Sequence, residues 1–388
     1  MIVDIGIVGG GPVGAALALA AARSGCKVAL VEPGVARPMP VNGFDTRVYS
    51  LGQRSRQLLE ECGVWDELAQ ERTTPVHDMR VVGDDEASRL AFSAYRSEVR
   101  ELAVIVEESN LRQALARALD AQTTRVTRQS AQFQSVSWAK TGRATCLLSD
   151  GTSLDARLLV AADGADSTLR AAAGLVPEVR DYAQTGVVAN FRISLPHRNT
   201  AYQWFREDGV LAMLPLPGMH MSMVWSTGRE QAQTLLSLDA ESLAARVQQA
   251  CTGTLGKLTG LGAATGFPLR WMRVRRLIAP RLALVGDAAH LVHPLAGQGL
   301  NLGFGDVGCL ARILAQRGME DDCGAQSLLR RYERSRSEDI LAMQCVTDGL
   351  QRLFGADLPG LRRLRNLGLR ATDRIAPLKR WLVNRALG

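Results

Sequence analysis

One stretch near the N-terminus decides the fold: VDIGIVGGGPVG, residues 3–14. An apolar run of strand length is followed at once by glycines with the spacing G-x-G-x-x-G, at Gly9, Gly11 and Gly14. An alanine-rich run up to Ser24 then has the composition of a helix, and a second apolar strand ends at Glu32. A strand, a glycine turn, a helix and a strand in this order predict a dinucleotide-binding unit, in which the backbone approaches a pyrophosphate at the helix N-terminus.

Glu32 lies eighteen residues after Gly14, at the end of the second strand. There a carboxylate can accept hydrogen bonds from the hydroxyls of an adenosine ribose. The alternative is a tight strand-to-helix turn whose glycines serve packing alone. The motif by itself does not separate NAD from FAD.

Two further strand-to-turn motifs occur later in the chain. LLVAADGADSTLR, residues 158–170, is an apolar strand that ends in Asp163 and Gly164, although Asp-Gly is also a common turn pair. LALVGDAAH, residues 282–290, brings Asp287 to a sharp turn, where a carboxylate can hold polyol hydroxyls. The glycine-bounded helix start that follows would point free N–H groups at a ring that becomes negative on reduction. A helix cap is the alternative role for Asp287.

The rest of the chain shows two kinds of pattern. Helical periodicity is expected from Ser55 to Ala69 and from Ser109 to Leu119, and beyond Ser327 to the end. Strand-like alternation with Pro and Gly occupies the parts between, including a hairpin of residues 209–217 and 221–226. We therefore expect an α/β protein whose Rossmann-like nucleotide-binding domain carries an inserted antiparallel-sheet substrate domain and a helical C-terminal segment. The expected boundaries are residues 1–75, 101–181 and 269–350 for the first domain, 76–100 and 182–268 for the insert, and 351–388 for a basic helical segment.

The net charge of +7 is concentrated at the C-terminus. Residues 361–388 hold eight basic side chains and one acid, so the remaining residues carry 38 of each sign. This distribution argues against a nucleic-acid-binding face. Leucines every three residues, followed by Ile375, Leu378, Trp381 and Leu382, make this segment amphipathic if it is helical, and a peripheral contact with an anionic membrane is one expectation. Packing on the protein is the other.

The rest of the sequence argues against a membrane-spanning or secreted protein and against disulfide or metal sites. No run of eighteen apolar residues predicts a membrane-spanning helix, and no secretory signal is expected, so we expect a cytoplasmic protein. Seven cysteines without a C-x-x-C pair indicate reduced thiols. His290 and His293 lie three apart, but no carboxylate or thiolate completes a metal set, and no metal is expected.

The three motifs together resemble those of the class A flavoprotein monooxygenases, whose fold is the para-hydroxybenzoate hydroxylase type. HPLAGQGLNLG, residues 293–303, is similar to the ubiquinone-biosynthesis hydroxylases, and so are shorter matches such as GVLAMLPL, residues 209–216, and Tyr332-x-x-x-Arg336. The resemblance spans nearly the whole chain. Two residues depart from the family pattern. Glu108 stands where many relatives carry Arg or Gln, and Gly305 stands where close relatives often carry Arg.

The resemblance implies FAD as cofactor and NAD(P)H as co-substrate. The glycine loop and Glu32 would bind the ADP half, Arg47 the phosphates, Asp163 the pyrophosphate region, and Asp287 the ribityl chain, while Pro294 and the turn at 297–301 would face the flavin ring. The cofactor-binding residues expected on this basis are Gly9, Gly11, Pro12, Gly14, Glu32, Arg47, Asp163, Gly286, Asp287, Pro294, Gly297, Gln298, Gly299, Leu300 and Asn301.

The family mechanism implies that reduced flavin meets O2 and that the resulting C4a-hydroperoxide hydroxylates an electron-rich phenol. The leading hypothesis is a polyprenylated phenol in ubiquinone biosynthesis, with other proteins of that pathway as possible partners. The alternatives are a hydroxylase of small soluble phenols, a flavin-dependent prenyl reductase, and a non-catalytic flavoprotein subunit that binds prenylated substrates. No catalytic base is assigned, since Tyr202 and His220 of the insert are equally consistent with structural roles.

Overall fold

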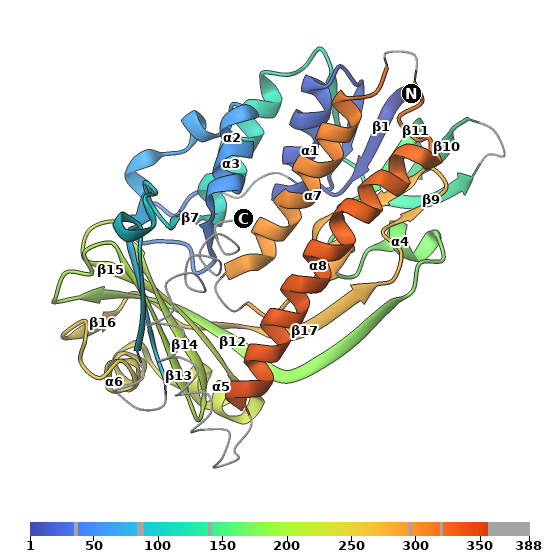
Figure 1. Cartoon of the computed structure of the whole chain (residues 1–388). Coiled ribbons are helices and arrows are strands. Elements are labelled where there is room, and N and C mark those ends of the chain that lie inside the picture. The colour runs from blue at the N-terminus through green and yellow to red at the C-terminus, as the bar shows by residue number, and fades with distance from the viewer. Residues whose placement is uncertain (35–37, 84–88, 139–141, 295–296, 319–320, 356–388) are drawn as a thin grey trace.

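A computed structural model describes residues 1–34, 38–83, 89–138, 142–294, 297–318 and 321–355 (Figure 1). The expected C-terminal segment beyond Gly355 lies outside the described residues, including its expected amphipathic face. None of the helices within these ranges has the length and apolarity needed to cross a membrane.

The first sheet is the nucleotide-binding one and has the order β18-β19-β11-β1-β2-β8. Its strands from β19 to β8 run parallel, and β9, β10 and β18 add antiparallel edges. β1, β2 and β11 are nearly continuous apolar runs because helices and other elements bury both of their faces. The strands are β1 (Ile2–Val8), β2 (Val28–Val31), β8 (Val126–Gln129), β9 (Phe133–Trp138), β10 (Ala144–Leu148), β11 (Ser153–Ala161), β18 (Ile278–Ala279) and β19 (Leu282–Leu284).

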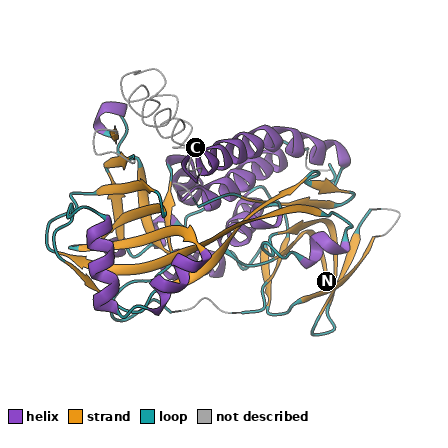
Figure 2. Ribbon diagram, turned by 90° about the horizontal axis from the view of Figure 1, so that it is seen from below, coloured by secondary structure: helices purple, strands orange, loops and turns teal. Residues whose placement is uncertain are grey.

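Helices gather on one side of this sheet (Figure 2). α1 packs against α3 and α7, and Figure 1 shows α7 between α1 and the long α8. The alanines of α1 allow this close approach, because every residue from Gly14 to Ala22 is buried. The helices of this layer and its edges are α1 (Pro12–Arg23), α2 (Gln53–Glu61), α3 (Glu108–Asp120), α4 (Thr168–Ala172), α7 (Gln298–Ala315) and α8 (Gln326–Gly355).

The second sheet has the order β20-β17-β12-β15-β14-β13-β5-β6, with β16 beside β12. The expected hairpin is confirmed as β14 and β15. All its pairs are antiparallel except β5 with β13, which are parallel because no short turn connects them and fixes their direction. The strands are β5 (Asp78–Val82), β6 (Arg89–Ser93), β12 (Pro177–Ile193), β13 (Thr200–Arg206), β14 (Gly209–Leu216), β15 (His220–Gly228), β16 (Leu258–Gly260), β17 (Thr265–Val274) and β20 (His290–Leu291).

A small third sheet has the strand order β3-β7-β4. Its strands β4 and β7 both contact β14 of the second sheet. Its strands are β3 (Val48–Leu51), β4 (Thr73–Val76) and β7 (Ala103–Glu107). A hydrophobic cluster that includes Val76, Ile105, Ala201 and Leu216 joins it to the second sheet. The third sheet therefore connects the second sheet to helices α3 and α7, which it contacts through β7 and β3.

Two expectations about helices need correction. The helix expected from Ser55 to Ala69 ends at Glu61, because Gly63 adopts a left-handed conformation with φ +70°, and a separate turn, Trp65–Glu67, follows. Two helices in the insert were missed, α5 (Arg229–Ser237) and α6 (Ala240–Ala250), which cover the face of the second sheet formed by residues such as Trp225. The helix expected at residues 109–119 is confirmed as α3.

A buried carboxylate, Asp306 of α7, connects the helical layer to the turn after β19. It accepts hydrogen bonds from Gly286 N at 2.9 Å, His290 Nε2 at 2.7 Å and Arg336 Nε of α8 at 2.8 Å. Burial opposes its ionisation, but His290 and Arg336 outweigh burial and hold the pKa of Asp306 below its usual 3.8. Gly305 leaves room for this arrangement, since a Cβ there would lie 2.8 Å from Arg336 Nη2.

We expect Asp306→Asn to lower the free energy of unfolding by about 3 kcal/mol, because it leaves the Arg336 guanidinium buried without its counter-charge. Urea unfolding of the FAD-bound protein measures this. Asp339→Asn is the matched control, because Asp339 pairs with the same guanidinium but is half exposed, and it should cost at most about 1 kcal/mol.

The pH dependence of this effect has a definite sign. Since the folded-state pKa of Asp306 lies below 3.8, its contribution is full above that pH and is lost as the pH falls through the lowered pKa. Equal losses for the two variants at neutral pH would contradict the assignment of Asp306 as the connecting charge.

Candidate FAD site and substrate cavity

The carboxyl ends of three adjacent parallel strands bring the three motifs together. β19, β11 and β1 are neighbours in the sheet, and the turns at Gly286, Ala162 and Gly9 follow them directly. Ligands of open α/β sheets bind at this edge. A Cβ on Gly9, whose φ is +108°, would lie 2.2 Å from Ala162 O, so only glycine lets the first two turns pack together.

Gly11 and Gly14 have different environments. A Cβ on Gly14 would lie 1.9 Å from Gly9 O, which makes its glycine a packing requirement of the turn. A Cβ on Gly11 would meet nothing within 4 Å, and Gly11 lines a cavity. The open space over Gly11 is where a ligand can approach the backbone.

Two helix N-termini face this space without a side chain to cap them. α1 begins after Gly11 with Pro12, and α7 begins after Gly297, whose φ is +66°. Neither helix has an acidic residue in its first turn. Their free N–H groups and the positive ends of the helix dipoles are therefore directed to an anionic ligand.

One cavity of about 860 Å³ runs from these turns to the second sheet. That volume is in the range of cofactor and ligand pockets. The expected site residues that line it are Gly11, Pro12, Arg47, Asp287, Pro294, Gly297, Gln298, Gly299, Leu300 and Asn301. Gly9, Gly14 and Gly286 support the turns from behind, and Glu32 and Asp163 stand outside the lining.

Glu32 packs against the glycine loop, since a Cβ on Gly10 would lie 2.3 Å from its carboxyl carbon. Its carboxylate is 3.2 Å from Arg112 and 3.8 Å from Arg128. Burial raises the pKa of Glu32, although both guanidiniums oppose the rise. Arg112 also lines the cavity, and the sequence analysis did not single it out.

Asp163 is engaged by the short helix α4. Its Oδ2 accepts hydrogen bonds from Thr168 N at 2.8 Å and Leu169 N at 3.2 Å. Its Oδ1 is buried and has no partner within the described ranges. The neighbouring backbone of Ala162 and Gly164, not the carboxylate, lines the cavity.

Asp287 projects into the cavity and is exposed there, although protein encloses the cavity around it. This enclosure raises the pKa of the Asp287 carboxyl, and His290 and Arg47 oppose the rise. Arg47 is also exposed into the cavity, and its Nε lies 3.8 Å from Glu108 Oε2. A carboxylate and a guanidinium thus share the same cavity wall.

Asn301 lines the cavity, but its side-chain amide already makes hydrogen bonds to protein groups. Oδ1 accepts from Gly52 N at 2.9 Å and Ser55 Oγ at 2.6 Å, and Nδ2 donates to Ser50 O at 2.8 Å. Asn301 therefore fixes the end of β3 and the start of α2 against the start of α7. No motif in the sequence pointed to this segment, although its residues Tyr49, Ser50 and Gly52 also line the cavity.

The histidines have structural partners. His293 Nε2 is 3.1 Å from Gln184 Oε1, its ring meets Tyr182 edge-on, and burial lowers its pKa to about 4. Among the described residues, no group of three or more His, Cys, Asp or Glu side chains could hold a metal. His220 Nδ1 is 2.9 Å from Pro217 O, and His220 does not line the cavity. Tyr202 is among the lining residues, and its ring stacks on Trp204.

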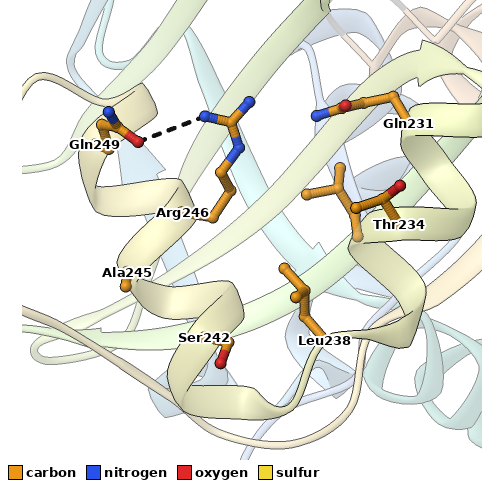
Figure 3. Close-up of a pocket in the computed structure, with 8 residues that line it drawn as sticks. Gln231, Thr234, Leu238, Ser242, Ala245, Arg246 and Gln249 are labelled. Atoms are coloured by element: carbon orange, nitrogen blue, oxygen red, sulfur yellow. Dashed lines mark hydrogen bonds between the residues drawn. The ribbon is translucent and has the colours of Figure 1, made fainter.

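A second hollow lies between α5 and α6, away from the glycine turns (Figure 3). Arg246 projects into it and contacts Gln249 at 3.5 Å and Asp208 at 3.4 Å. Its lining is mostly amide, hydroxyl and small side chains on two exposed helices. It has no connection to the chemistry of the first cavity.

Comparison with known proteins agrees with this geometry. A family model described as FAD binding domain matches residues 2–347. The chain is 36% identical over 389 residues to the ubiquinone hydroxylase UbiL of Rhodospirillum rubrum, covering 100% of this chain and 90% of the relative. It is 34% identical over 387 residues to the 3-demethoxyubiquinol 3-hydroxylase of Escherichia coli, covering 99% and 98%.

Among solved structures, the chain is similar to PqsL of Pseudomonas aeruginosa in complex with 2-aminobenzoylacetate. The TM-score is 0.81 at 25% identity, and the match covers 96% of this chain and 100% of that one.

The residues present fit FAD. The open backbone at Gly11 and the uncapped α1 suit a pyrophosphate, and the uncapped α7, with open space above Gly299, suits a flat ring that gains negative charge. Asp287 and Arg47 provide an acceptor and a cation between these two ends. The cavity also has a wall on the second sheet, which these residues do not form.

We expect Asp287→Ala to weaken FAD binding by about 1.5–3 kcal/mol, because it removes a charged acceptor of hydrogen bonds. The measurement is the fraction of flavin that stays with the protein on dilution to low micromolar concentration. Asp166→Ala is the control, since that carboxylate is strongly exposed and outside the cavity lining. Full FAD occupancy of the Asp287 variant would disprove its role.

Proposed function

The chain belongs to the FAD-binding family of flavoprotein monooxygenases, and from this membership we propose that it hydroxylates the aromatic ring of a polyprenylated phenol in ubiquinone biosynthesis. Two relatives that match nearly the whole chain are named for hydroxylation of ubiquinone or its precursors. The observation that supports the proposal most is that a single cavity joins the FAD turns to an apolar sheet face.

One molecule of NAD(P)H supplies the two electrons that the reaction needs. A phenol, O2, NAD(P)H and a proton give the hydroxylated phenol, water and NAD(P)⁺. When bound, FAD would supply the redox chemistry, which is the transfer of two electrons from the nicotinamide to dioxygen. Every other contribution in this proposal comes from the chain's own residues.

The proposed binding roles divide along the cavity. The N-terminus of α1 and Arg47 would bind the phosphates of FAD, Glu32 the adenosine ribose, and Asp287 the ribityl chain. The Asp163 turn would contribute to the pyrophosphate region. The N-terminus of α7, with Pro294 before it, would face the flavin ring, and its helix dipole would favour negative charge there.

The apolar wall excludes water from the reacting ring and accepts the prenyl chain. Its members come from the second and third sheets and from the segment between them, for example Val76, Met79, Phe92, Leu102 and Leu214. Dry surroundings prevent the activated oxygen from being lost as peroxide. An apolar wall of this size favours a prenylated phenol over a small soluble one, which remains the second candidate.

We expect a prenylated phenol to accelerate NAD(P)H oxidation by the FAD-bound protein and to raise O2 consumption with it. An oxygen electrode and nicotinamide absorbance measure both rates. Phenols that differ only in prenyl length should differ in KM, with longer chains binding more tightly because each buried CH₂ contributes about 0.8 kcal/mol. Formation of hydroxylated product without O2 would refute the monooxygenase, and equal KM values would favour the small-phenol candidate.

We also propose that the basic segment 361–388, outside the described residues, brings the enzyme to an anionic membrane surface where a prenylated substrate resides. Its eight Lys and Arg side chains support this, since each contributes about 1 kcal/mol near such a surface. Association with other proteins of the pathway would use the same location.

We expect the full chain to sediment with anionic vesicles at low salt but not with neutral ones. Charge reversal of the five residues Arg362, Arg363, Arg365, Lys379 and Arg380 should abolish this. Equal sedimentation of the two proteins at every salt concentration would leave packing on the protein as the role of the segment.

A further inference from the structure

The cavity-facing side of the second sheet carries an amide side chain, Gln203, beside a run of apolar residues. Strand pairing puts Gln203 of β13 opposite Val81 on one side and Ala212 on the other. The row continues through Val224 and Val188 to Thr265. Paired residues project from the same face of a sheet, and Ala212, Val224 and Val188 line the cavity with Gln203, so the Gln203 side chain points into it.

Gln203 is a buried residue whose amide opens into the cavity. The residue is 6% exposed, and its side chain makes no hydrogen bond within the ranges that the structure describes. A polar group that loses its hydrogen bonds on burial costs free energy, so a ligand that displaces water from this wall must provide a partner for the amide. Because the amide opens onto the substrate end of the cavity, that partner is a polar group of the ligand.

Neighbouring polar side chains do not offer the same contact. Tyr202 projects from the opposite face and stacks on Trp204 at 5.6 Å. Asn190 donates to Phe44 O at 3.0 Å and to Asp45 O at 2.9 Å. Its Oδ1 and the Oγ of Ser222 have no partner among the described residues, but neither residue lines the cavity. Thr265 ends the same row, but four strand spacings separate it from Gln203, about 19 Å along the sheet. A single aromatic ring cannot contact both ends of the row.

We infer that the side-chain amide of Gln203 binds the hydroxyl of the phenolic substrate and thereby selects which ring carbon faces the flavin. This inference rests on the proposed function. An amide suits the task because Oε1 accepts from a phenol O–H and Nε2 donates to a phenolate, so the ring is held in either protonation state. The surrounding valines and alanine hold the ring by contact alone, and Gln203 fixes its rotation.

The test compares two ligands of the FAD-bound protein: a short-chain prenylated phenol and the same molecule with hydrogen in place of the hydroxyl. Binding is followed by the change in flavin absorbance. The wild type should bind the phenol about tenfold more tightly. Gln203→Met keeps the length of the side chain without its hydrogen bonds, and it should remove this preference while the affinity for the hydroxyl-free ligand is kept.

A second readout separates orientation from affinity. With saturating phenol, Gln203→Met should release more hydrogen peroxide per NAD(P)H oxidised, because a ring that rotates freely is hydroxylated less often. Thr265→Val is the matched control, since it removes a cavity-lining hydroxyl from the same row and should leave preference and coupling unchanged. Gln203→Leu repeats the test if the Met variant loses its FAD.

The outcomes distinguish this inference from the proposed function. A wild type that prefers the phenol, together with a Gln203 variant that keeps the same preference and coupling, overturns the role of Gln203 alone. If Thr265→Val loses the preference instead, Thr265, at the other end of the row, is the residue that binds the phenol hydroxyl. A wild type without any phenol preference or phenol-stimulated oxidation overturns the proposed function itself.

Discussion

The site depends on the hydrogen bonds that the buried carboxylate of Asp306 accepts. This carboxylate receives hydrogen bonds from the backbone of Gly286, the ring of His290 and the guanidinium of Arg336. The turn that presents Asp287 is therefore fixed to α7 and α8 rather than to its own strand alone. A buried ion pair is not in itself stabilising, but one that loses a partner is strongly destabilising, so the geometry of this turn is tied to the folding of the helical layer. The strand β20 starts at His290, which carries the same constraint to the second sheet.

The features that depend on a few neighbouring residues were predicted well from the sequence. The glycine loop and the turn at Asp287 each follow a short apolar strand, and α7 starts after Gly297, so residues within a few positions decide these features. Helix ends were predicted less well: the left-handed Gly63 ends α2 early although the apolar spacing continues to Trp65. The amphipathic helices α5 and α6 were missed because the surrounding strands dominated the pattern.

Contacts between distant segments account for what the sequence did not reveal. Gln203 faces the cavity because of its pairing with β5 and β14, and no periodicity distinguishes it from Tyr202 beside it. Arg112 is near Glu32 only because α3 packs on α1. Asn301 was expected at the flavin ring and does line the cavity, but its amide is used to hold Ser50 and Gly52, a role that depends on a segment some 250 residues away in sequence.

We propose that flavin, dioxygen and phenol meet in one cavity, where an oxygen atom passes from O2 to the ring. The most direct measurement is turnover of a prenylated phenol by the FAD-bound protein under ¹⁸O₂ in ordinary water, with mass spectrometry of the product. The account predicts one ¹⁸O atom in each hydroxylated product molecule. A product that carries only oxygen from water would contradict it.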